Sequence, residues 1–118
     1  MTPEEFVDAL KRDCRDSAVS GCLQTFRAPP GRKPSPELVE LSDWYRALSS
    51  HDQEKVAAAM HQAADATLFS VLCVIDGLSA IEPCGEKSDF KLSATRGGVE
   101  SVIAPGSEFL HDILRSDP

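Results

Sequence analysis

Apolar residues recur with the period of an α-helix through most of this chain. Thr2, Pro3 and Glu5 mark the first helix start, because the threonine caps, the proline occupies the first helical position and the glutamate completes a capping box. The helical period then either continues through Ser17 or restarts there. The sequence therefore predicts helix over residues 3–27. Its apolar positions are Phe6, Val7, Leu10, Cys14, Ala18, Cys22, Leu23 and Phe26.

The stretch APPGRKPSP, residues 28–36, interrupts this pattern. Its four prolines exclude both a helix and a central strand. With Arg27, the residues Arg32 and Lys33 form the only concentrated positive charge of the chain. A site for phosphate or an acidic ligand is conceivable there, but a solvated surface loop is the expected role.

Two further helices are predicted after this loop. Ser35 and Pro36 supply a cap and a first helical residue, and the stripe that follows predicts helix over 36–48. Ser50 with Gln53 then fits a capping box, and the period of 3.6 continues over residues 51–80. Such a length is unusual in a globular protein, so a kink or break is expected near residues 65–67. The stripe of the first of these helices is Leu38, Leu41, Tyr45 and Leu48, with Trp44 beside it.

The pattern changes to period two near residue 89, which predicts an antiparallel hairpin over about 89–103. A two-residue turn at Gly97-Gly98 joins its strands. The register that follows pairs Arg96 with Val99, Ala94 with Ser101 and Leu92 with Ile103, and it places Phe90 on the face of Leu92.

A short last helix over 107–115 is predicted to begin with Ser107 as its cap. Phe109, Leu110, Ile113 and Leu114 are expected to face inward. The fold class is therefore α+β: a mainly helical single domain over 1–118, with four to five helices and one C-terminal hairpin packed on the long central helix.

The acidic composition argues against two classes of binding partner. The net charge of −7 and the pI of about 4.8 argue against a nucleic-acid backbone or an anionic membrane as partner. No signal peptide is visible, and no apolar run is expected to reach the length of a membrane span, because Ser70 and Asp76 interrupt the best one. We therefore expect a cytoplasmic protein with free thiols, since the spacing of Cys14, Cys22, Cys73 and Cys84 contains no CxxC.

The sequence contains no strong motif for catalysis or for metal binding. His61 and Asp65 have the i, i+4 spacing of metal ligands, yet no known metal motif surrounds them, so a polar helix pair is expected. Cys73 lies between apolar residues that make a thiol inert, whereas Cys84 beside Gly85 is the more exposed thiol. No nucleophile elbow or phosphate-binding loop occurs. The sequence thus predicts no catalytic residue, no cofactor and no metal site.

The segment LCVIDGLSAIE, the hairpin and the closing EFLHDIL resemble small uncharacterised bacterial proteins. In these proteins an apolar helix ending in Asp-Gly precedes a hairpin and a Leu-His-Asp tail. The resemblance covers about the last half of the chain and implies neither an activity nor catalytic residues.

Two functions remain open. The first is a non-enzymatic interaction domain that binds another protein or itself, such as an immunity or antitoxin-like inhibitor of a basic effector or a homodimeric adaptor. The second is a small-ligand sensor or enzyme with a pocket between hairpin and central helix, using Asp76, Cys84 or His111. The residues singled out for a partner or ligand patch are Trp44, Tyr45, Asp65, Asp76, Glu82, Cys84 and His111.

Overall fold

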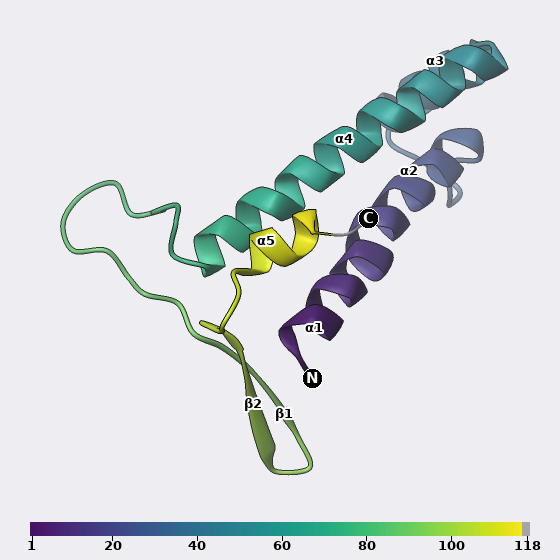
Figure 1. The fold of residues 1–118 in the computed structure, drawn as a ribbon. Coiled ribbons are helices and arrows are strands. Elements are labelled where there is room, and N and C mark those ends of the chain that lie inside the picture. The colour runs from purple at the N-terminus through teal and green to yellow at the C-terminus, as the bar shows by residue number, and fades with distance from the viewer. Residues whose placement is uncertain (117–118) are drawn as a thin grey trace. The chain divides into compact units, whose positions relative to one another are not determined.

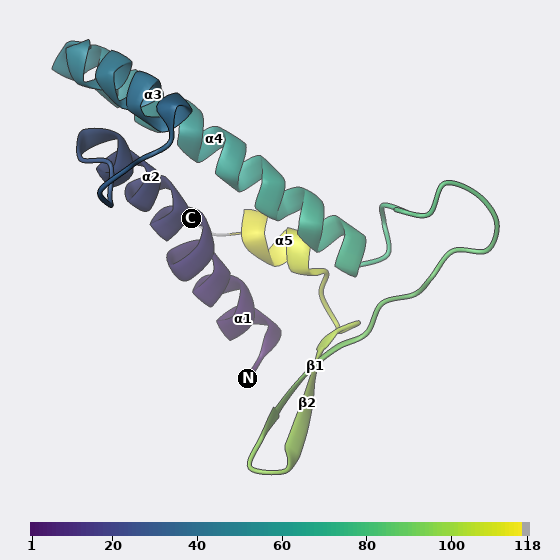
Figure 2. The same ribbon diagram turned by 180° about the vertical axis from the view of Figure 1, so that it is seen from behind.

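The computed structural model describes residues 1–116, and it is mainly helical with one antiparallel hairpin near the C-terminus (Figures 1 and 2). This confirms the predicted α+β class. Its contacts group into two compact units. We call residues Met1–Arg12 with those from Ala66 onward the terminal unit, and Asp13–Asp65 the middle unit. The expectation of a single cooperative domain stays a prediction.

The elements follow the predicted order. The helices are α1 (Pro3–Leu10), a π-helical segment (Lys11–Asp16), α2 (Ser17–Arg27), α3 (Pro36–Ala47), α4 (Ser50–Ile75) and α5 (Leu110–Arg115). The strands are β1 (Leu92–Arg96) and β2 (Val99–Ala104). The first predicted helix is thus one helical run with a π-helical insertion, while the last helix begins three residues later than expected.

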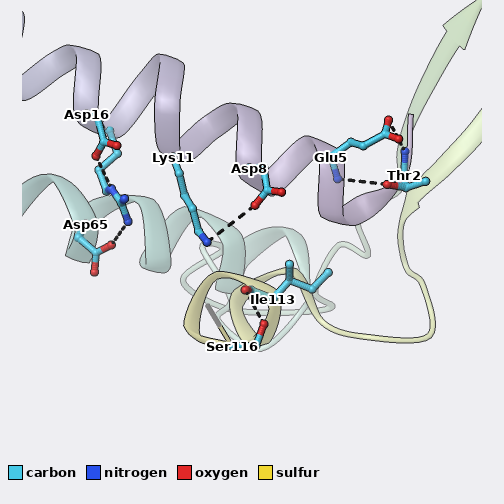
Figure 3. Close-up of polar contacts among 9 residues, drawn as sticks. Thr2, Glu5, Asp8, Lys11, Asp16, Asp65, Ile113 and Ser116 are labelled. Atoms are coloured by element: carbon cyan, nitrogen blue, oxygen red, sulfur yellow. Dashed lines mark hydrogen bonds and ion pairs between the residues drawn. The ribbon is translucent and has the colours of Figure 1, made fainter. Parts of the chain in front are cut away.

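Two of the predicted helix starts are confirmed. The Glu5 amide donates to Thr2 Oγ1 at 3.1 Å and the Thr2 amide donates to Glu5 Oε2 at 3.4 Å, which is the expected capping box (Figure 3). Ser35 caps α3 by accepting from the Leu38 amide at 3.3 Å. The start of α4 differs by one residue, because Ser49 rather than Ser50 accepts a helix amide, that of Asp52 at 3.1 Å.

Helix α4 ends at Ile75, five residues before the predicted end. Gly77 has a φ of +81°, which a residue with a Cβ rarely adopts. Its amide donates to the Val74 carbonyl at 3.1 Å, and the Leu78 amide donates to the Cys73 carbonyl at 3.0 Å. This pair of bonds is a Schellman motif. No atom of another element lies within 4 Å of a Cβ built on Gly77, so its role is to end the helix rather than to admit a neighbour.

The helix is not broken near residues 65–67, since α4 is continuous over 26 residues; the alternative of a kink there stays a prediction. By length and composition alone α4 is also apolar enough to cross a membrane, which corrects the expectation that no segment reaches such a length. Only 6% of the apolar window of α4 is buried, so this helix is mostly exposed, and a single helix of this kind is weak support for a membrane span. In the terminal unit, Leu68, Phe69, Leu72 and Ile75 of α4 pack in the protein core.

The hairpin has the predicted turn and most of the predicted register. Arg96 pairs with Val99 and Ala94 with Ser101, as expected. Leu92, however, pairs with Ala104 rather than with Ile103, because a bulge between Leu92 and Ser93 shifts the register. Phe90 precedes the strand and is exposed, so its predicted place on the inner face is wrong.

The core of the terminal unit joins both ends of the chain. In both ribbon views α5 lies beside the C-terminal half of α4 (Figures 1 and 2). The buried residues of this core are Val7, Leu72, Ile103, Ala104, Leu110, Ile113 and Leu114. Leu92 and Ala94 pack against them, which confirms that the hairpin contacts the long helix. Phe109 is exposed, in contrast to its predicted inward position.

The middle unit has a smaller core around Tyr45. Its ring is 1% exposed and lies 5.8 Å from the Phe26 ring, centroid to centroid. Ser42, one turn earlier on α3, is fully buried and donates its hydroxyl to the Phe26 carbonyl. The Gln53 side chain donates to the Tyr45 carbonyl at 3.0 Å, which ties α4 to the end of α3. Helices α2 and α3 are therefore joined by packing and by a buried polar bond.

Leu72→Ala tests the terminal core. Leu72 is fully buried, and we expect its truncation to lower the free energy of unfolding by about 2–5 kcal/mol. The neighbouring Val71→Ala is the matched control, because Val71 is half exposed on the same helix, and it should change stability by less than about 1 kcal/mol. Urea unfolding followed by circular dichroism measures both. Equal effects of the two substitutions contradict this account of the core.

Candidate functional site

The Asp76 carboxylate, one residue past α4, holds the N-terminus of α5. Its Oδ1 accepts the Leu110 amide and its Oδ2 accepts the His111 amide, each at 3.0 Å. These amides belong to the first turn of α5, whose amides have no partner within the helix. Asp76 therefore caps a helix 34 residues away in sequence. The predicted cap, Ser107, is not used, because Phe109 occupies the N-cap position and makes no side-chain cap.

The His111 ring adds a third bond to the same carboxylate. Its Nδ1 lies 2.7 Å from Asp76 Oδ2, and its Nε2 lies 3.3 Å from Asp112 Oδ1. The two groups are well buried, with 13% of the His111 side chain and 3% of the Asp76 side chain exposed. The Asp76 side chain is therefore a buried group whose carboxylate accepts two backbone amides.

Aromatic side chains enclose the His111 ring. Phe69 of α4 contacts it edge-on at 5.6 Å, and Phe109 stacks on it at 5.4 Å, centroid to centroid. The guanidinium of Arg115, the last residue of α5, lies over the Phe69 ring, 4.4 Å from its centroid. Cation–π and edge-to-face contacts of this kind each add modest stability. The cluster thus fixes both ends of α5 on α4.

Asp76 and His111 resemble the carboxylate–histidine pair of some enzymes, but the Asp76 carboxylate also accepts two backbone amides of α5. All three of the bonds described for Asp76 go to α5. Among residues 1–116 no group of three or more His, Cys, Asp or Glu side chains is arranged to hold a metal ion. The chemistry that the geometry supports is the fastening of α5 to α4.

Cys73 and Cys84 have different environments. Cys73 is half buried on α4, and burial raises the pKa of its thiol, with the negative charge of Asp76 adding to the effect. Cys84 is exposed in the loop between α4 and β1. All four cysteines are unpaired thiols. Cys73 is only partly buried and is not among the residues of the core cluster. The expected inertness of its thiol stays a prediction.

Glu82 organises part of the loop that carries Cys84. Its carboxylate accepts the Ser88 amide at 3.0 Å and also the Ser88 hydroxyl, and these bonds lower the pKa of Glu82. The Glu82 carbonyl accepts from Lys87 Nζ at 2.5 Å. Glu82 therefore holds its own loop together, and no bond links it to Asp76 or His111 among the contacts described here.

Asp65 belongs to the middle unit and is held by Arg15. The Arg15 guanidinium lies 2.9 Å from Asp65 Oδ1 and 2.9 Å from Asp16 Oδ1, which places it between two carboxylates (Figure 3). This pairing raises the pKa of Arg15 and lowers that of Asp16. His61 Nε2 lies 3.5 Å from Asp16 Oδ1. The Arg15–Asp65 pair joins the π-helical segment to α4 within the middle unit. The expected polar pair of His61 and Asp65 stays a prediction.

Trp44 and Tyr45 point to different environments, as expected for adjacent helical residues. Tyr45 is in the core of the middle unit, and Arg27 donates to its hydroxyl at 3.4 Å. Trp44 is 51% exposed. Exposure of half of such a large ring is uncommon for a residue that is highly buried on average.

Trp44 shares one face of α3 with residues that the sequence reasoning did not select. Glu37, Glu40, Leu41 and Trp44 line an open hollow of about 390 Å³. We call these four residues the α3 face. Leu41 was predicted to be part of the buried stripe, but it is exposed, because Leu38, Ser42 and Tyr45 turn toward the core instead. The spacing i, i+3, i+4, i+7 of the four is the sequence signal for this face.

The structure therefore divides the seven predicted patch residues into separate places. Asp76 and His111 come together beneath α5, whereas Glu82 and Cys84 lie in the loop before β1. Asp65, Trp44 and Tyr45 belong to the middle unit. No protein-family model, curated protein or solved structure matches this chain.

Asp76→Ala tests the fastening of α5. It leaves two amides and one ring nitrogen of α5 without their acceptor, so we expect a loss of about 2–4 kcal/mol of stability. Hydrogen exchange at the Leu110 and His111 amides should accelerate more than exchange in α2. Asp112→Ala is the matched control, since this carboxylate is 58% exposed. A control that destabilises as much as Asp76→Ala contradicts the proposed role.

Thiol alkylation tests the environment of Cys73. Because burial raises the pKa of its thiol, less thiolate is present at neutral pH and Cys73 should react last with iodoacetamide. The rate at Cys73 should continue to climb as the pH is raised above the ordinary thiol pKa. Peptide mass spectrometry resolves the four sites, with exposed Cys14, Cys22 and Cys84 as internal references. Early reaction at Cys73 contradicts this assignment.

Proposed function

We propose that this chain is a non-enzymatic protein-interaction domain whose binding surface is the α3 face. The observation that carries the proposal is the half-exposed Trp44 beside exposed Leu41 in the hollow of α3. Tryptophan supplies binding energy at protein interfaces more often than most residues do. The flanking carboxylates of Glu37 and Glu40 favour a basic partner.

The rival function, a ligand sensor or enzyme that uses Asp76, Cys84 or His111, has less support. Asp76 and His111 direct their bonds to α5. Cys84 lies in a different segment, which Glu82 organises through Ser88. A binding role therefore fits the distribution of polar groups better than a catalytic one.

The proposal extends to location and class. The acidic composition fits a cytoplasmic domain that docks on a positively charged protein surface. An immunity-like inhibitor of a basic effector and a homodimeric adaptor are two forms of this function. Both require that a protein ligand cover Trp44.

Affinity capture from the source organism tests this function. Tagged wild-type chain should recover a specific protein, which includes an untagged copy of the chain itself, and Trp44→Ala should reduce the recovery at least about tenfold, as expected of an interface hot spot. Leu78→Ala is the matched control, because Leu78 is an equally exposed apolar residue of the terminal unit. Quantitative mass spectrometry compares the three baits. Recovery that is the same for wild type and Trp44→Ala contradicts the proposal.

A further inference from the structure

The middle unit carries two oppositely charged surfaces that have no partner within the described part of the chain. The first is the α3 face, in which neither Glu37 nor Glu40 takes part in an ion pair among residues 1–116. The second is the loop of residues 28–35, where Arg32 and Lys33 are exposed and likewise unpaired in that range. Arg27, by contrast, is engaged with Tyr45.

The loop has the composition of a ligand for an aromatic, acidic surface. Pro29, Pro30 and Pro34 restrict its backbone, and Pro30 is exposed beside the basic pair. Proline-rich segments bind grooves that present aromatic rings, because a restricted backbone loses little entropy on binding and the proline ring packs on the aromatic face. Basic residues next to the prolines add pairing with carboxylates.

The α3 face supplies the matching groups. Trp44 offers a half-exposed ring, Leu41 adds apolar area, and Glu37 and Glu40 flank them along the same side of the helix. On this helix Glu40 lies about one turn before Trp44, and Glu37 lies about two turns before it. A proline on Trp44 thereby brings a following arginine or lysine within reach of a carboxylate.

We propose that the occupant of the α3 face is the 28–35 loop of a second copy of this chain, bound reciprocally about a two-fold axis. This deepens the proposed function by naming its partner. In such an isologous contact the loop of each copy meets the α3 face of the other. The charge pattern supports this choice, because two copies with a net charge of −7 each repel unless a basic segment meets an acidic one.

The chain provides its own spectroscopic reporter. Trp44 is the only tryptophan, so its emission reports the α3 face alone. Raising the protein concentration at low salt should shift this emission to the blue as the ring becomes covered. Salt at 1 M shortens the screening length to about 3 Å and should oppose the shift.

A charge-swap experiment by analytical ultracentrifugation tests the proposal. The acidic-face variant is Glu37→Lys with Glu40→Lys, and the loop variant is Arg32→Glu with Lys33→Glu. Each variant alone brings like charges together and should weaken dimerisation by about tenfold or more. An equimolar mixture pairs basic with acidic groups at both contacts and should restore a heterodimer. Circular dichroism confirms that each variant is folded.

Three results overturn the proposal: a wild-type chain that stays monomeric at millimolar concentration, a dimer that neither variant weakens, or a mixture that does not restore association. A synthetic peptide of the loop, APPGRKPSP, separates this failure from that of the proposed function. Binding of the peptide to a strictly monomeric chain overturns the second copy as occupant but leaves a protein ligand on Trp44 supported. Loss of host partners on Trp44→Ala in a monomeric chain does the same.

Discussion

The bond between Asp76 and the first turn of α5 is the constraint on which the terminal unit depends. One carboxylate accepts bonds from two amides and lies 2.7 Å from a histidine ring that Phe69 and Phe109 contact. Because the Schellman motif at Gly77 ends α4 at Ile75, Asp76 emerges where α5 can meet it. The end of one helix and the start of another are thus a single structural feature.

Some charged side chains of the two units are bonded within the fold, and others are exposed. In the terminal unit the buried carboxylate of Asp76 accepts hydrogen bonds from α5. In the middle unit Arg15 forms ion pairs with Asp16 and Asp65. On the α3 face, exposed carboxylates lie next to exposed apolar side chains, and the proline-rich loop carries exposed positive charge. Such a combination of an aromatic ring and unpaired charge is typical of a recognition surface rather than of a core.

Local rules predicted the elements well, and non-local contacts account for the errors. Caps at Thr2 and Ser35 and the turn at Gly97-Gly98 depend on neighbouring residues, so the sequence reveals them. The cap of α5 comes from a distant residue, so the choice of Ser107 was wrong. Likewise, periodicity could not decide whether Leu41 or Ser42 faces inward, because the partner of Ser42 is the Phe26 carbonyl of another helix, which the local pattern does not contain. The sequence predicted Trp44 as a candidate partner residue, but it did not predict that Glu37 and Glu40 share its face of α3.

The terminal core brings Val7 together with Leu110, Ile113 and Leu114. On a ribosome Val7 is synthesised before the middle unit and residues 110–114 are synthesised after it, so this core can close only after residues 110–114 have left the exit tunnel. The middle unit lies between them in sequence and contains its own packed helices, so it is free to form earlier. The order of synthesis therefore favours a nascent chain in which α2 and α3 are already packed together before α1 contacts β2 and α5.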